Sequence, residues 1–75
     1  MKDEVNSQPV KLVIEHIKKQ IAERRILPGE RLPSERKLSE LLQVSRSHVR
    51  EALQKMELYG IVKIYPQSGT VVSEF

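Results

Sequence analysis

The sequence predicts a small, mainly helical domain that ends in a β-hairpin, an α+β fold with three helices. Three features point to this fold. Apolar residues recur at helical spacing in the first third of the chain, two short segments each follow a serine that can cap a helix, and the last third places β-branched residues around a polar turn. A length of 75 residues allows a single domain with one modest core.

The composition excludes several classes of protein. Hydrophobic residues make up 39% of the chain and charged residues 31%, which suits a folded domain better than a disordered chain. The chain has no cysteine, so disulfides, thiolate metal sites and cysteine nucleophiles are excluded. No apolar run approaches the length of a membrane span and the first residues are polar, so we expect a soluble, cytoplasmic protein without a membrane partner.

The first helix is expected from Pro9 to Ile26, because apolar residues there recur every three or four positions. Pro28 and Gly29 then favour a turn and end the helix. Residues 1–7 are polar and aperiodic and are predicted to form a flexible N-terminal segment. The folded domain accordingly comprises residues 8–75.

Two short helices are expected over about residues 35–58. Ser34 can cap the first and Ser45 the second, each near the place where a phosphate would meet a helix end, and Gly60 supplies a stop. Their apolar stripes are Leu38, Leu41 and Leu42 in the first, and Val49, Ala52, Leu53 and Met56 in the second. Two capped helices with so short a break form a helix-turn-helix, a motif that also occurs in helical bundles without a nucleic-acid role.

The last stretch is expected to form the hairpin over about residues 61–73. Ile61–Tyr65 and Thr70–Val72 favour strands, and Pro66–Gly69 forms a four-residue polar tip between them. Arg31 and Leu32 could add a small strand to the sheet. Three helices followed by a hairpin give the element order of a winged helix-turn-helix.

The positive charge is concentrated in the middle of the chain. The net charge is +3, and residues 31–50, with five basic and two acidic side chains, account for all of it. A basic surface attracts polyanions, although a cluster of this size is also compatible with a solvated face.

The amino end of the third helix carries polar side chains suited to a major groove: Arg46, Ser47, His48 and Arg50. A helix amino end favours phosphate, and an arginine fork can bond a guanine edge with two donors. Alternatively, Arg46 and Arg50 are surface arginines that pair with Glu51 or Gln54. His48 is equally compatible with a structural or phosphate-facing role and with a base contact.

Two further elements are candidates for DNA contact. Arg36, in the first turn of the second helix, is placed to touch a phosphate, or else it pairs with Glu40 one turn later. Gln67, Ser68 and Gly69 at the hairpin tip could reach a minor groove or could simply form a turn, and Gly69 is expected to have a positive φ.

The residues offer nothing for catalysis. His16 and His48 are far apart in the chain, no acidic pair has metal-ligand spacing, and the three glycines form no phosphate-binding loop. We therefore expect no enzymatic activity, metal or cofactor in this chain.

Five motifs closely resemble those of the GntR family of bacterial transcriptional regulators: Pro28–Arg36, Val44–Arg46, Val49–Leu53, Gly60–Val62 and Ser68–Val72. The similarity extends from about residue 8 to residue 73 and looks most like the FadR-type subfamily. It implies a winged helix-turn-helix in which Arg36, Arg46 and Arg50 meet DNA and Ser47 and His48 lie near bases and phosphates. Gln43 and Gln67 stand where the family often has glycine.

The resemblance also implies the function. The chain is expected to be an excised DNA-binding domain that binds double-stranded, palindromic operator DNA as part of a homodimer. A C-terminal domain absent from this chain would bind a small-molecule effector and form the dimer. The alternatives are a winged-helix module that binds only proteins, or a DNA-binding domain fused to an enzyme such as an aminotransferase-like domain.

Overall fold

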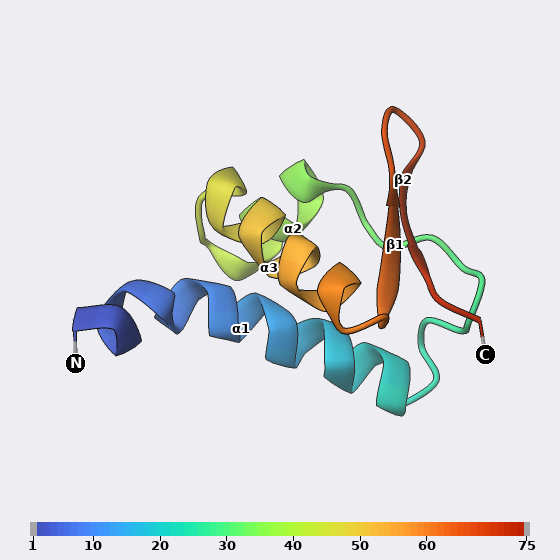
Figure 1. Ribbon diagram of the computed structural model, residues 1–75, viewed down its shortest axis with the longest axis horizontal. Helices are drawn as coiled ribbons and strands as arrows, with labels where there is room; N and C mark the ends of the chain where they lie inside the picture. Colours follow the sequence, from blue (N-terminus) through green and yellow to red (C-terminus); the bar gives the residue numbers. More distant parts are fainter. Residues whose placement is uncertain (1, 75) are drawn as a thin grey trace.

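The computed structural model describes the backbone of residues 2–74 and the side chains of residues 8–74. Three helices, α1 (Lys2–Ala22), α2 (Glu35–Leu42) and α3 (Arg46–Leu58), precede two strands, β1 (Val62–Tyr65) and β2 (Gly69–Val72). Helix α1 runs along one side of α2 and α3, and the hairpin stands at the carboxyl end of α3 with its tip directed away from α1 (Figure 1). The predicted order of three helices and a hairpin is confirmed.

Helix α1 begins and ends earlier than the apolar spacing predicts. It includes residues 2–7, which the sequence assigns to a flexible segment, and Pro9 lies inside it. Their flexibility stays a prediction, and their side chains lie outside the described part. At the other end, Arg24 takes a left-handed conformation (φ 61°), and the amide of Arg25 bonds the carbonyl of Gln20 at 2.9 Å. This closing turn ends the helix well before Pro28.

The connection between α2 and α3 has the geometry of a helix-turn-helix. Ser34 caps α2, with its Oγ accepting a hydrogen bond from the amide of Lys37 at 3.1 Å. Gln43 ends α2 in a left-handed conformation (φ 56°, ψ 47°), and the amide of Val44 reaches back to the carbonyl of Ser39 at 3.2 Å. A residue other than glycine pays a steric cost in this conformation, so the turn is strained where the family motif often has glycine.

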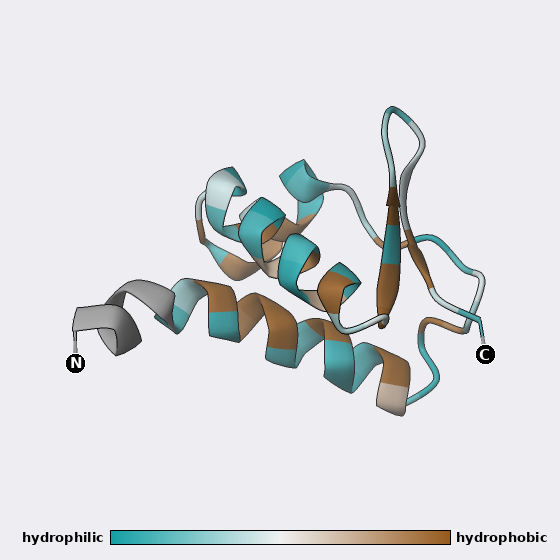
Figure 2. Cartoon of the chain, viewed as in Figure 1, coloured by the Kyte–Doolittle hydropathy of each residue, from teal (hydrophilic) through white to brown (hydrophobic). Residues whose placement is uncertain are grey.

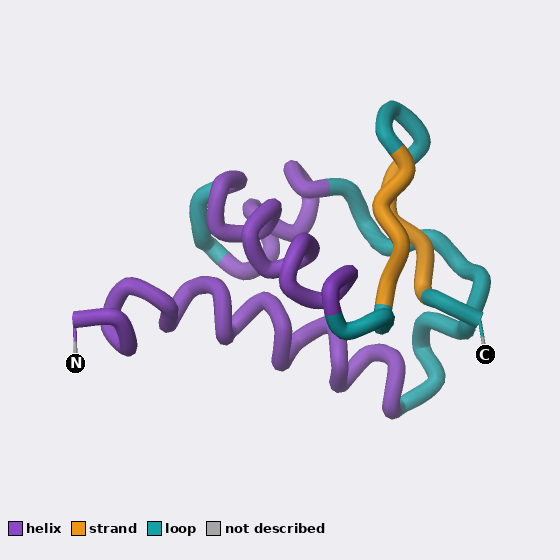
Figure 3. Tube along the Cα trace, viewed as in Figure 1, coloured by secondary structure: helices purple, strands orange, loops and turns teal. Residues whose placement is uncertain are grey.

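The sheet is a two-stranded antiparallel hairpin with a short third segment beside it. Val62 pairs with Val72 and Tyr65 with Gly69, so the tip comprises residues 66–68, one fewer than predicted. Arg31 forms an isolated antiparallel bridge with Val71, and the amide of Leu32 bonds the carbonyl of Thr70 at 2.8 Å. The small strand suggested for Arg31 and Leu32 is thus present only as an isolated bridge beside β2. Figure 3 draws the segment between α1 and α2 as a loop that passes the hairpin.

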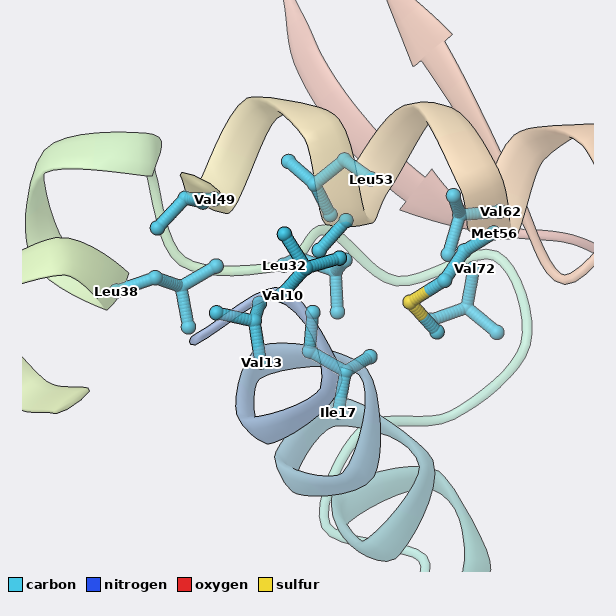
Figure 4. Close-up of a cluster of buried hydrophobic side chains, with 11 residues drawn as sticks. Val10, Val13, Ile17, Leu32, Leu38, Val49, Leu53, Met56, Val62 and Val72 are labelled. Atoms are coloured by element: carbon cyan, nitrogen blue, oxygen red, sulfur yellow. The ribbon is translucent and has the colours of Figure 1, made fainter. Parts of the chain in front are cut away.

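One hydrophobic core joins all the elements. Its side chains come from the three helices, the loop before α2 and the hairpin, and they point toward one another (Figure 4). Figure 2 shows the corresponding apolar side of α1 facing the rest of the chain. The buried apolar residues are Val10, Val13, Ile17, Leu32, Leu38, Val49, Ala52, Leu53, Met56, Val62 and Val72.

The core matches most of the predicted apolar stripes, and the largest exception is on α2. Leu41, assigned to the apolar stripe of α2, is 64% exposed, whereas Leu38 on the same helix is fully buried. An eight-residue helix presents only a narrow face to the core, which Leu38 and the partly buried Leu42 occupy, so Leu41 points outward. Within the described residues, no helix combines the length and apolar character needed to cross a membrane.

Candidate nucleic-acid interface

The first turn of α3 is fixed by the cap at Ser45. The backbone of Ser45 is extended (φ −72°, ψ 155°), and its Oγ accepts a hydrogen bond from the amide of His48 at 3.3 Å. The cap satisfies one of the amides that a helix leaves unpaired at its start. Arg46 and Ser47, the first residues of the helix, are exposed, and the turn contains no acidic residue. The helix dipole therefore leaves partial positive charge at an accessible surface.

The predicted contact residues Ser47 and His48 belong to a hydrogen-bonded cluster with Ser45. Ser45 Oγ lies 3.0 Å from Ser47 Oγ and 2.8 Å from Nδ1 of His48. Because Nδ1 of the half-buried imidazole faces the serine, Nε2 is the ring nitrogen directed toward other partners. His48 thus has a structural contact with the cap, and its role toward DNA stays a prediction.

Arg50 has a partner that the sequence analysis missed. Its Nε donates to Oε2 of Glu35 and its Nη2 to Oε1, both at 3.1 Å. The alternative partners considered from the sequence, Glu51 and Gln54, are not used by Arg50; Glu51 instead lies 3.7 Å from Lys55. The hydrogen bonds that Arg50 donates to Glu35 raise the pKa of Arg50 above its ordinary value.

The other two arginines differ in their surroundings. Arg36 Nε lies 3.4 Å from Oε2 of Glu40, the alternative foreseen for it, and both side chains are exposed. Such an exposed pair contributes at most about 1 kcal/mol, so a phosphate can replace the carboxylate at little cost. Arg46 takes part in no ion pair among the side chains that the structure describes. Its guanidinium is the one most readily available to an external acceptor.

A groove of about 380 Å³ brings together predicted site residues from three segments of the chain. Ser34 and Arg36 line it from the start of α2, Arg46 from the start of α3, and Gln67 and Gly69 from the hairpin. In Figure 1 these ends of α2 and α3 and the hairpin tip lie on the side of the molecule opposite α1. Ser47, His48, Arg50 and Ser68 do not line the groove.

The hairpin tip is shaped by two residues with positive φ. Gly69 has φ 100°, as predicted, and Gln67 has φ 69° behind Pro66, which is the arrangement of a type II turn. The amide of Ser68 bonds the carbonyl of Tyr65 at 3.0 Å and closes the turn. Thr70, which follows the polar tip in sequence, is buried because alternation along β2 places it on the same face as Val72. The exposed tip therefore consists of uncharged donors and acceptors on a short projection.

The described side chains include no group of three or more histidine, cysteine, aspartate or glutamate residues that could hold a metal ion. The polar groups that line the groove are three hydroxyls, from Ser34, Tyr65 and Thr70, together with an amide, two guanidinium groups and the carboxylate of Glu35. This set can bind an anion and form directional hydrogen bonds.

Sequence comparisons place the chain among bacterial regulators. A family profile described as "Bacterial regulatory proteins, gntR family" matches residues 9–72. The HTH-type transcriptional regulator Mce2R of Mycobacterium tuberculosis is 44% identical over 63 residues, which cover 84% of this chain and 26% of that regulator. A fatty acid metabolism regulator protein of Shewanella oneidensis is 39% identical over 67 residues, covering 89% of this chain and 28% of the regulator. The chain spans about a quarter of the length of these curated relatives.

A structural comparison agrees with the sequence match. The DNA-binding domain of AraR, crystallised with its operator ORX1, superposes with a TM-score of 0.83 and 29% identity, over 87% of this chain and 78% of that chain. The fold is accordingly a winged helix-turn-helix, with the hairpin as its wing. With a profile match over residues 9–72, the chain belongs to the GntR family of bacterial regulatory proteins.

Proposed function

We propose that this domain binds double-stranded operator DNA in a sequence-specific manner. The amino end of α3 enters the major groove, where Arg46 and Arg50 bond base edges and Ser47 and His48 assist. Arg36 and the capped starts of α2 and α3 contact phosphates, and Gln67, Ser68 and Gly69 of the wing approach the adjacent minor groove. The main support is the groove that joins Ser34, Arg36, Arg46 and the wing on one side of the molecule.

The proposal for the whole protein goes further. We infer a homodimer that binds a palindromic site in the bacterial cytoplasm and responds to a small-molecule effector through a C-terminal domain. The support is the GntR family membership of residues 9–72 and the much greater length of the relatives. The similarity to a fatty acid metabolism regulator favours the FadR-type subfamily.

Selection of bound duplexes from a random pool tests the proposal directly. The chain should enrich a defined sequence. The logarithm of its binding constant for that sequence should fall linearly with the logarithm of the salt concentration. Lys18→Ala serves as the control variant, because it removes a positive charge from α1, away from the groove. Recovery of no preferred sequence together with salt-independent binding would favour the protein-interaction module.

A further inference from the structure

Glu35 occupies an unusual place for an acidic residue beside a nucleic-acid surface. It is the first residue of α2, directly after the Ser34 cap, and its side chain is only 29% exposed. Both carboxylate oxygens bond the guanidinium of Arg50 on α3, at 3.1 Å each. The pair joins residues 15 positions apart and therefore ties the two helices of the helix-turn-helix together.

The geometry of this pair leaves one donor edge of Arg50 unused. A guanidinium carries five N–H groups. Glu35 takes the side edge, formed by Nε and Nη2. The end edge, formed by Nη1 and the second N–H of Nη2, still presents two parallel donors. Two parallel donors match O6 and N7 of guanine.

We propose that Glu35 is a positioning residue that holds Arg50 in the orientation needed for base recognition, an inference that rests on the proposed DNA binding. The carboxylate is itself anchored, because the capped start of α2 fixes its backbone and the helix dipole favours its charge. Arg50 is thus ordered in the free domain, so less side-chain entropy is lost when DNA binds. The ordering of one such side chain is worth about two- to tenfold in affinity.

The proposal predicts two effects of opposite sign when Glu35 loses its charge. A carboxylate near phosphates weakens binding to every duplex, so Glu35→Gln should raise affinity for random DNA. The same change releases Arg50, so discrimination at the base pair that Arg50 contacts should fall by about two- to tenfold. If the pair only stabilised the fold, Glu35→Gln would not reduce discrimination at a single base pair. Nor would its effect on discrimination depend on the presence of Arg50.

The experiment uses the selected duplex and its set of single base-pair variants. Arg50→Ala first identifies the base pair whose preference depends on Arg50. Glu35→Gln is then compared with Glu40→Gln, which removes an equal charge from the same helix but releases Arg36 instead. Arg50→Lys keeps the charge and can still approach Glu35, but it lacks the planar fork and should lose the preference. Circular dichroism checks that each variant is folded.

We expect Glu35→Gln to weaken the preference at the Arg50 base pair only, Glu40→Gln to leave every preference unchanged, and Glu35→Gln to have no further effect in an Arg50→Ala background. Unchanged or stronger discrimination in Glu35→Gln would overturn the inference, since Glu35 would then be neutral or would mask Arg50. An equal loss of affinity for all duplexes in Arg50→Ala would overturn it too and would show that Arg50 contacts no base, while sequence-specific DNA binding by the domain would stand. Absence of duplex binding by the unmodified chain would instead refute the proposed function.

Discussion

At the residue scale, the three candidate arginines differ in the ion pairs that each would have to break or keep when it contacts DNA. Arg36 and Arg50 have carboxylate partners, whereas Arg46 has no ion-pair partner among the described side chains. Arg46→Ala should therefore cost about 1–3 kcal/mol on the selected duplex, which is the value of a bidentate contact with guanine. Competition binding against single base-pair variants should show one position at which preference is lost. Equal losses on selected and random duplexes would contradict this role.

The ion pairs of Arg36 and Arg50 differ in whether the sequence alone predicts them. The pair of Arg36 with Glu40 follows from helical spacing, because residues four apart share one face. The pair of Arg50 with Glu35 joins two helices, so it depends on the crossing of α2 and α3 and leaves no periodic signal. The sequence shows an acidic residue, Glu35, at the start of α2, but only the fold shows that its side chain faces α3.

The turn after α3 carries a prediction about Gly60. Gly60 has φ 78°, and a Cβ added to it would meet nothing within 4 Å. The cost of Gly60→Ala is therefore conformational, and we expect the free energy of unfolding to fall by about 1 kcal/mol. Urea denaturation measures this directly. Gln43→Gly, at the equivalent place after α2, should not destabilise the fold, and a comparable loss there would argue against the conformational explanation.

At the scale of elements, the starts of α2 and α3 were predictable from the sequence, whereas neither the start nor the end of α1 was. Ser34 and Ser45 cap α2 and α3 as the sequence indicates, because an N-cap needs a particular side chain. The left-handed residues that end α1 and α2 are Arg24 and Gln43, which have no such preference. Gly60 ends α3 as predicted. The end of α3 was therefore predicted from a glycine, and the end of α1 was missed because Arg24 forms the left-handed turn there.

The cap of α3 links stability to the candidate interface. Ser45→Ala removes the acceptor for the amide of His48 and the contact with its Nδ1. We expect a loss of about 1 kcal/mol in the free energy of unfolding, since the amide of His48 loses its side-chain acceptor and keeps only the carbonyl of Ser45, at 3.1 Å. Chemical denaturation provides the measurement. Ser47→Ala deletes a hydroxyl from the same turn but leaves the capping bond, so a loss as large as that of Ser45→Ala would contradict the capping argument.

At the scale of the whole molecule, the stability of the domain depends on a single core, so truncating one buried side chain should have a large effect. Leu38 is fully buried, so Leu38→Ala should cost about 2–5 kcal/mol through lost burial and a cavity. A core in a chain of this size supplies only about 3–5 kcal/mol of stability, so much of the variant should be unfolded. Thermal denaturation followed by circular dichroism tests this. Leu41→Ala, on the same helix but 64% exposed, should retain the original melting temperature.

The arrangement of charge over the whole surface determines how binding depends on salt. Each phosphate neutralised by an arginine or lysine releases condensed cations, and the slope of log K against log salt counts these contacts. Arg36→Ala should reduce the magnitude of that slope by about one and weaken selected and random duplexes alike, because a phosphate contact carries no base preference. Lys18→Ala, on α1 at the opposite side of the domain, should leave the slope unchanged. A change in base preference for Arg36→Ala, or an unaltered slope, would show that Arg36 does not act on the phosphate backbone.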